Sequence, residues 1–143
     1  MTTLKTMILS ISAVALSGAS GLYAQTQVTA EIPFEFSVLN TTLPAGTYTM
    51  QSMSSVSGVM LIRNVESRKA ITVLAPSNFS EYKGAQKKDV VLFHQIGDRY
   101  FLAEVKTDWL CGHVGPSKLE RELKSETDGQ PVAAVIIPAL SVR

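Results

Sequence analysis

Residues 28–38 read Val-Thr-Ala-Glu-Ile-Pro-Phe-Glu-Phe-Ser-Val, and this stretch decides the fold class. Its apolar residues occupy every second position: Val28, Ala30, Ile32, Phe34, Phe36 and Val38. A period of two places these side chains on one face of a β-strand, and polar residues fill most of the other face. Pro33 belongs to the outward-facing set and cannot donate a hydrogen bond to a sheet, so we expect an edge position or a bulge there.

Six further strand-like segments follow, separated by turns and loops. They are residues 47–53, 59–65, 70–75, 89–96, 99–107 and 132–137, the last of which we expect to be largely buried. Turn-forming residues stand at Pro44-Ala45-Gly46, at residues 66–69 and at Gly97-Asp98. About seven strands joined in this way predict an all-β fold, either a single antiparallel β-sandwich or a small β-barrel.

The turn at Gly97-Asp98 also predicts a register for the hairpin around it. The facing pairs expected on one side are His94 with Phe101, Leu92 with Ala103, and Val90 with Val105. The other side would hold Val91, Phe93, Tyr100 and Leu102. Because both sides are substantially apolar, we expect this hairpin to be central in the sheet and covered on both faces.

One segment near the C-terminus, residues 116–126, predicts a short helix of about nine residues. Ser117 and Glu120 form a capping box, which satisfies backbone donors at a helix start. Leu119 and Leu123 share one helix face, so we expect them to dock the helix on the sheet.

The first 24 residues have the three parts of a secretory signal peptide. Lys5 provides a positive start, residues 7–16 are apolar, and small residues precede a cleavage site after Ala24. An earlier cut after Ala19 fits as well. Residues 25–143 then form a single β domain, which we expect to be exported to the periplasm or the extracellular space.

Charge and hydropathy exclude several classes of partner for the mature chain. Without Lys5, the 13 basic residues become 12, equal to the 12 acidic ones. A balanced surface argues against a nucleic-acid partner, which requires a basic patch. The longest apolar run, residues 132–137, is too short to anchor the mature chain in a membrane.

Two histidines, His94 and His113, are the best candidates for general acid–base chemistry. One interpretation is a hydrolase-type pair of His94 and Asp98. The alternative is a half-buried strand histidine whose ring nitrogens bind backbone or water. We favour the alternative because no activated nucleophile stands in a recognisable motif with His94.

Cys111 is the only cysteine and lies in the motif Cys111-Gly112-His113. This motif suggests either a thiol nucleophile activated by His113 or part of a metal site. A zinc site needs three or four ligands in recurring spacings, and no second ligand cluster is visible. We therefore favour a simple thiol or an intermolecular disulfide. Trp109 beside Cys111 suggests that this loop packs against a protein partner or forms a homodimer.

Three methionines, Met50, Met53 and Met60, raise the question of copper(I), which prefers soft sulfur ligands. Methionine also fills gaps in ordinary cores. Since no histidine accompanies the three thioethers, we favour core packing. The sequence therefore assigns no catalytic, cofactor-binding or metal-binding residue.

Five segments occur in a fixed order along the mature chain: Ile32-Pro33-Phe34-Glu35-Phe36, Leu43-Pro44-Ala45-Gly46-Thr47-Tyr48, Leu61-Ile62-Arg63-Asn64, residues 92–102, and Ser117 with Glu120-Arg121-Glu122-Leu123. This order resembles a family of small exported proteins of unknown function from acidobacterial genomes. The resemblance covers most of the mature chain and is most specific at residues 44–48 and 97–102. It implies a bacterial envelope or secreted protein, and it supplies no activity, ligand or catalytic residue.

Three functions remain open on this evidence. The leading one is a non-enzymatic exported β module with a binding or structural role. The second is a lipocalin-like β-barrel that holds a small apolar ligand, although large inward aromatic side chains would fill such a barrel. The third is a hydrolase-type enzyme that uses His94 with Asp98, or Cys111 with His113.

Overall fold

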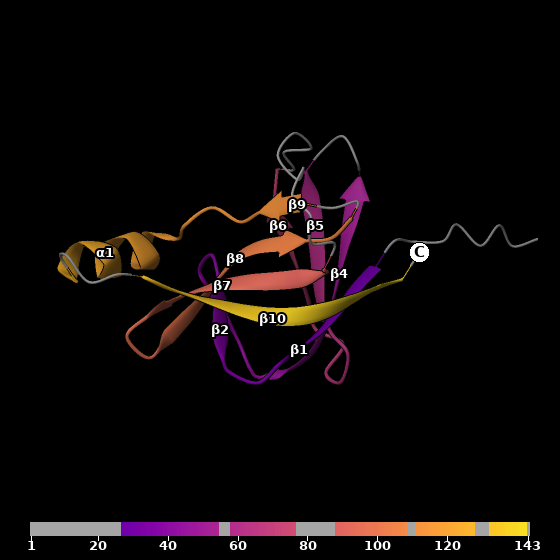
Figure 1. Cartoon of the computed structure of the whole chain (residues 1–143), viewed down its shortest axis with the longest axis horizontal. Coiled ribbons are helices and arrows are strands. Elements are labelled where there is room, and N and C mark those ends of the chain that lie inside the picture. The colour runs from indigo at the N-terminus through magenta and orange to yellow at the C-terminus, as the bar shows by residue number, and fades with distance from the viewer. Residues whose placement is uncertain (1–26, 55–57, 77–87, 109–110, 128–131, 143) are drawn as a thin grey trace, which may run out of the picture.

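The computed structural model describes residues 27–54, 58–76, 88–108, 111–127 and 132–142, so the predicted signal peptide lies outside the described residues (Figure 1). The described chain is mostly β-strand with one short helix, as expected, but it has ten strands rather than seven. They are β1 (Gln27–Ile32), β2 (Phe36–Val38), β3 (Thr41–Leu43), β4 (Gly46–Ser54), β5 (Val59–Asn64), β6 (Ala70–Leu74), β7 (Val90–Ile96), β8 (Arg99–Lys106), β9 (Cys111–His113) and β10 (Ala133–Val142), with α1 (Lys118–Glu126) before β10.

The three additional strands, β2, β3 and β9, have three residues each, and β3 and β9 are too short for alternation to be recognised in them. β2 is the second part of the strand predicted over residues 28–38, which breaks next to Pro33. Proline has no N–H to donate to the sheet, so the ladder stops there. Ile32 before the break and Phe36 after it are both buried, so the inward-facing pattern continues across it.

All ten strands belong to one sheet. Its order is β3-β2-β8-β7-β10-β1-β4-β5-β6, and β9 pairs with the remaining part of the β8 edge. Only β2 and β8 pair in parallel among the described strands. In Figure 1, β4 and β5 run across β7 and β8, so the sheet curls like half a barrel. The expectation of a sandwich is corrected accordingly.

The sheet turns at β10, the strand between its two halves. Residues 133–138 pair with β7, and residues 139–142 pair with β1. Pro138 is tolerated because the strand changes partner beside it, where a donor is not required. Asp89 fixes the second half, because its carboxylate accepts hydrogen bonds from the N–H of Ser141 at 3.0 Å and from the Ser141 hydroxyl.

The prediction that residues 132–137 form a largely buried strand is wrong. β10 continues to Val142, and its outward side chains are exposed, with Ile136 at 60% and Leu140 at 74%. The partly buried residues that pack on the core are Val135, Ile137 and Ala139. Apolar residues on both sides of the strand suggested burial, but the core covers only one side.

The inner face of the curled sheet carries the core. Phe36 from β2 packs edge-to-face against Phe93 of β7 and Tyr48 of β4, with ring centroids 5.3 and 5.0 Å apart. The Tyr48 hydroxyl donates to the backbone oxygen of Pro44 at 2.6 Å, so this buried phenol has its partner. Buried aliphatic and methionine side chains surround these rings: Val28, Ile32, Val38, Met50, Met60, Ile62, Val91, Leu102 and Val105.

The β7–β8 hairpin confirms the Gly97-Asp98 turn but corrects part of the register. His94 faces Phe101 as predicted. Beyond that pair an irregularity between Leu92 and Phe93 shifts the register, so that Leu92 faces Glu104. Val90 likewise faces Lys106 instead of Val105. A β-bulge adds one residue to one strand and cannot be read from turn chemistry alone.

On one side of the curled sheet, β9 approaches the residues that follow β6. The His113 N–H donates to the Pro76 oxygen at 3.4 Å. Gly112 fits closely here, since a Cβ at this position would lie 3.4 Å from the Ala75 Cβ. Gly58 has a left-handed φ of +59°, and a Cβ there would lie 3.0 Å from the Pro76 Cα. We call these contacts of β9 and Gly58 with residues 75–76 the closure.

Candidate functional site

His94 is paired with helix α1 rather than with Asp98. Its Nδ1 atom lies 2.9 Å from Glu120 Oε1, which also contacts Lys124 Nζ at 3.0 Å. Asp98 is exposed in the turn between β7 and β8. The His94/Asp98 pair of the hydrolase hypothesis is therefore replaced by a pair that fastens α1 to β7.

The predicted helix is confirmed, but the residues that dock it are different from those expected. The Ser117 hydroxyl accepts a hydrogen bond from the Glu120 N–H at 3.0 Å, as a capping box requires. The Glu120 carboxylate is turned toward His94, and the residue is 3% exposed. Leu119 is 38% exposed, so the expectation that it docks the helix is wrong, whereas Leu123 is half-buried. Apolar spacing pointed to the leucines because His94, the partner of Glu120 on β7, is distant from it in the sequence.

The motif Cys111-Gly112-His113 gains a third polar member, Glu104, from the neighbouring strand. β8 pairs with β9 so that Glu104 lies opposite His113 and Lys106 lies opposite Cys111. Side chains alternate along a strand, so these four share the outward side of the sheet. Gly112 between the two ligand-type residues is buried and faces the core.

Three potential ligand atoms converge in this group, which we call the Glu104 cluster (Glu104, Cys111 and His113). The Cys111 thiol donates to Glu104 Oε1 at 3.2 Å, and its sulfur lies 3.7 Å from His113 Nε2. The same His113 nitrogen is 3.5 Å from Glu104 Oε1. Lys106 Nζ contacts the other carboxylate oxygen at 3.1 Å. In the described part of the chain this is the one group of three such residues with converging atoms.

Burial differs sharply across the Glu104 cluster. The Glu104 side chain is 9% exposed, whereas that of His113 is 47% exposed. The cluster is therefore held firmly at its carboxylate and open to solvent at its imidazole. Sequence reasoning missed Glu104 because β9 is too short to predict and its pairing with β8 was not expected. A sign of Glu104 was present in the sequence, because Glu104 and Lys106 are two residues apart and so share one face of the strand.

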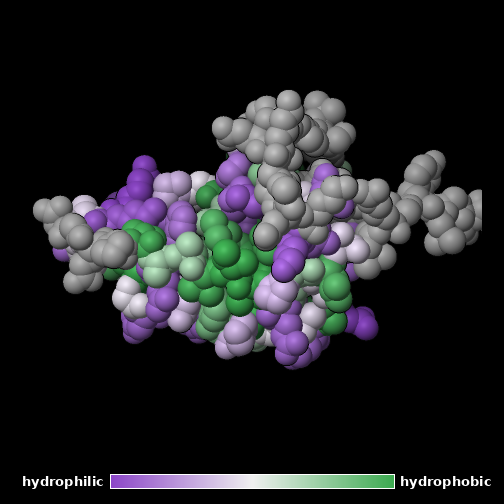
Figure 2. All heavy atoms as spheres, in the orientation of Figure 1, coloured by the Kyte–Doolittle hydropathy of each residue, from purple (hydrophilic) through white to green (hydrophobic). Residues whose placement is uncertain are grey.

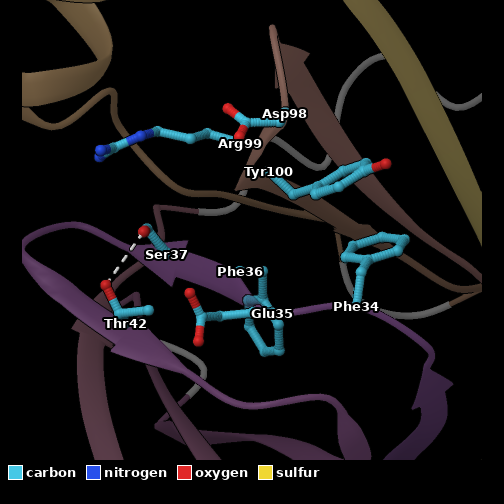
Figure 3. A pocket seen from close by; sticks show the side chains of 8 residues that line it. All are labelled: Phe34, Glu35, Phe36, Ser37, Thr42, Asp98, Arg99 and Tyr100. Carbon is cyan, nitrogen blue, oxygen red and sulfur yellow. Dashed lines mark hydrogen bonds between the residues drawn. The ribbon is translucent and has the colours of Figure 1, made fainter.

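A surface pocket of about 540 Å³ lies between β2, β3 and the β7–β8 turn (Figure 3). Phe34 and Tyr100 stack in it, with ring centroids 3.9 Å apart. Exposed Glu35, Asp98 and Arg99 line its rim, and Figure 3 shows the arginine extending away from the stacked rings. This pocket is an open hollow with charged edges rather than an enclosed ligand cavity.

An apolar strip runs along the outward side of β10. Ala134, Ile136, Pro138 and Leu140 are all exposed. Leu92 of β7 faces Ile136, and Val90 faces Pro138; both β7 residues are half-buried. We call these six residues the apolar strip. Figure 2 shows a continuous hydrophobic area over the position of β10 and β7, with hydrophilic residues around it.

The methionine prediction holds for two of the three residues. Met50 and Met60 are buried in the core, whereas Met53 is 58% exposed. Trp109, which we expected to join Cys111 in a packing loop, lies outside the described residues. Cys111 itself begins strand β9 instead of lying in a loop.

Comparisons with protein-family models, curated proteins and solved structures find no match to this chain. Of the helical residues that the structure describes, none belongs to a helix with the length and apolar character needed to cross a membrane.

Proposed function

We propose that this chain is an exported, non-enzymatic β module of the bacterial envelope or extracellular space, and that it binds protein through the apolar strip. The observation that carries the proposal is the exposure of Ile136 and Leu140 on a strand in the middle of the sheet. Exposed apolar patches with polar rims are typical of protein interaction sites. The signal-peptide pattern and the resemblance to exported acidobacterial proteins support the location.

The two other hypotheses have less support. Phe36, Tyr48 and Phe93 occupy the inside of the curled sheet, which counts against a lipocalin-like carrier with an apolar ligand there. A hydrolase built on Cys111 and His113 would need a carboxylate on the ring nitrogen that does not face the sulfur. Glu104 instead approaches Nε2, the same nitrogen that faces Cys111.

The properties of the chain favour a second copy of itself as the partner that binds the apolar strip. The expected mature chain has equal numbers of acidic and basic residues, so two copies carry no net charge that would keep them apart. A strip along one strand can also pair with itself about a two-fold axis, because such an interface uses the same patch on both subunits. Aligned strips would shield Ile136 and Leu140 from water in both copies.

Charged residues in the apolar strip should abolish this association. We expect the purified chain to show a concentration-dependent rise in molar mass toward a dimer in analytical ultracentrifugation. Replacing both Ile136 and Leu140 by glutamate should weaken the dimer at least about tenfold, because two buried apolar side chains become charged. The matched control is Leu74→Glu, at an exposed leucine on β6, which should leave the dimer unchanged.

A wild-type chain that remains monomeric at every concentration would contradict self-association. So would a dimer that survives Ile136→Glu with Leu140→Glu. A dimer that is instead broken by Leu74→Glu would place the interface on β6. Thermal unfolding of each variant separates lost association from lost folding.

Export is tested independently of association. When the full chain is expressed with its first 24 residues, we expect the protein in the periplasmic fraction or the medium. Its intact mass should correspond to a chain that begins at Gln25, or at Ser20 if the earlier site is used. Retention of the uncleaved chain in the cytoplasm would refute the proposed location and leave the dimer experiment valid.

A further inference from the structure

The Glu104 cluster lies on the same side of the sheet as the apolar strip but has a different chemistry. A row of facing residues crosses four strands, from Ile136 through Leu92 and Glu104 to His113. A thiol, an imidazole and a carboxylate, each a ligand type used by Zn²⁺, meet at the far end of this row. Glu104, Cys111 and His113 belong to paired strands, so the backbone ladder sets the spacing of their side chains.

The geometry points to a Zn²⁺ site formed by Cys111 Sγ, His113 Nε2 and Glu104 Oε1. With ordinary Zn–S, Zn–N and Zn–O bond lengths, the ligand atoms of a tetrahedral site lie about 3.3–3.6 Å from one another. The three separations here are 3.2, 3.5 and 3.7 Å. Small side-chain adjustments would therefore bring all three atoms onto one ion.

Convergence on a single point distinguishes this arrangement from a nucleophile with a proton relay. In a relay, the base uses one ring nitrogen for the nucleophile and the other for the carboxylate. Here both Cys111 and Glu104 approach Nε2 of His113. Three ligand atoms that surround one point, rather than lie in a line, are the arrangement that a metal ion requires.

The surroundings of Glu104 also suit a ligand. Lys106 holds the second carboxylate oxygen at 3.1 Å, which fixes the orientation of the group and leaves Oε1 directed toward the cluster. In the metal-free state, the Cys111 thiol donates a hydrogen bond to this oxygen. Binding of Zn²⁺ would take the place of the thiol proton, which leaves to solvent as the thiolate forms.

The exposure of His113 gives a metal ion access to the site, and the number of protein ligands sets what else can bind the ion. Its half-exposed imidazole gives the ion a route from solvent. Three protein ligands leave the fourth tetrahedral position for water or for an anionic group of a ligand. This site does not depend on the proposed self-association, although it borders the same face.

The test uses the purified chain, stripped with a chelator and kept under a non-thiol reductant, and titrates it with Co²⁺ and then Zn²⁺. We expect one Co²⁺ per chain, with a sulfur-to-metal charge-transfer band and the visible bands of a tetrahedral ion, both abolished by Zn²⁺. Cys111→Ser should remove the charge-transfer band. Glu104→Gln and His113→Gln should each weaken Zn²⁺ binding at least about tenfold.

The matched control is His94→Gln, which alters the other histidine–glutamate pair and should leave Zn²⁺ binding unchanged. Zn²⁺ should also raise the unfolding temperature of the wild-type chain but not of His113→Gln, since an ion that binds the folded state stabilises it. His113 is half-exposed, so this variant should fold even if Glu104→Gln does not.

A wild-type chain without a charge-transfer band would overturn the site, and so would a band that persists in Cys111→Ser. Zn²⁺ binding that is lost in His94→Gln but kept in His113→Gln would also overturn it. Ultracentrifugation with and without Zn²⁺ separates this proposal from self-association. The dimer can fail while metal binding persists, and the reverse holds equally.

Discussion

Replacing Phe93 by alanine should lower the free energy of unfolding by about 3–5 kcal/mol. Phe93 is fully buried and contacts Phe36 and Phe34 edge-to-face, with ring centroids 5.3 and 5.1 Å apart. Truncation removes the buried ring and leaves a cavity among side chains from separate strands, which cannot collapse around it. Urea denaturation followed by circular dichroism measures the loss, with an unchanged slope as evidence that unfolding remains two-state.

The control for Phe93→Ala is Leu74→Ala, at a leucine that is 68% exposed. That change should stay within about 0.5 kcal/mol of wild type, as surface substitutions usually do. A loss below about 1 kcal/mol for Phe93→Ala would contradict the described core, since buried aromatic side chains rarely cost so little. Equal losses in the two variants would contradict it as well.

Replacing Gly58 by alanine should cost about 2–3 kcal/mol, through backbone strain and through a clash at the closure. Gly58 adopts φ of +59°, where an L-residue is strained. The new Cβ would also lie 3.0 Å from the Pro76 Cα, a backbone atom that cannot move away as a side chain can. The same denaturation experiment measures this loss.

Gly97 provides a control that isolates the clash. Its φ is +62°, and a Cβ there would meet no atom within 4 Å. Gly97→Ala should therefore cost only the strain, about 1–2 kcal/mol. If Gly58→Ala and Gly97→Ala cost the same, the contact of Gly58 with Pro76 does not contribute to stability, and the account of the closure would need revision.

Local chemistry predicted much of the fold. The alternation in residues 28–38 identified an inward face that the structure buries at Ile32 and Phe36. The Gly97-Asp98 turn and the Ser117 cap are also where the sequence placed them. Each of these features depends on neighbouring residues along the chain, which a single sequence contains in full.

The features that could not be predicted depend on pairing between distant segments. The place of β10 between β7 and β1 leaves one of its faces without cover, and no local pattern distinguishes Ile136 from a buried isoleucine. Glu120 of α1 is buried where it pairs with His94, which lies on β7. Glu104 joins Cys111 and His113 through the pairing of β8 with β9. Spacing along the sequence therefore showed only Cys111 and His113, whereas the fold brings three potential ligand atoms together.

The position of β10 has a consequence for how such a chain would be secreted. A polypeptide that crosses a membrane from its N-terminus delivers β1 first and β10 last, yet these two strands are hydrogen-bonded neighbours. Until β10 has emerged, β1 and β7 each lack one of their two neighbouring strands, and contacts so distant in sequence form slowly. For the proposed export, this order of pairing means that the described sheet is completed only when β10, a strand of ten residues, pairs with both β1 and β7.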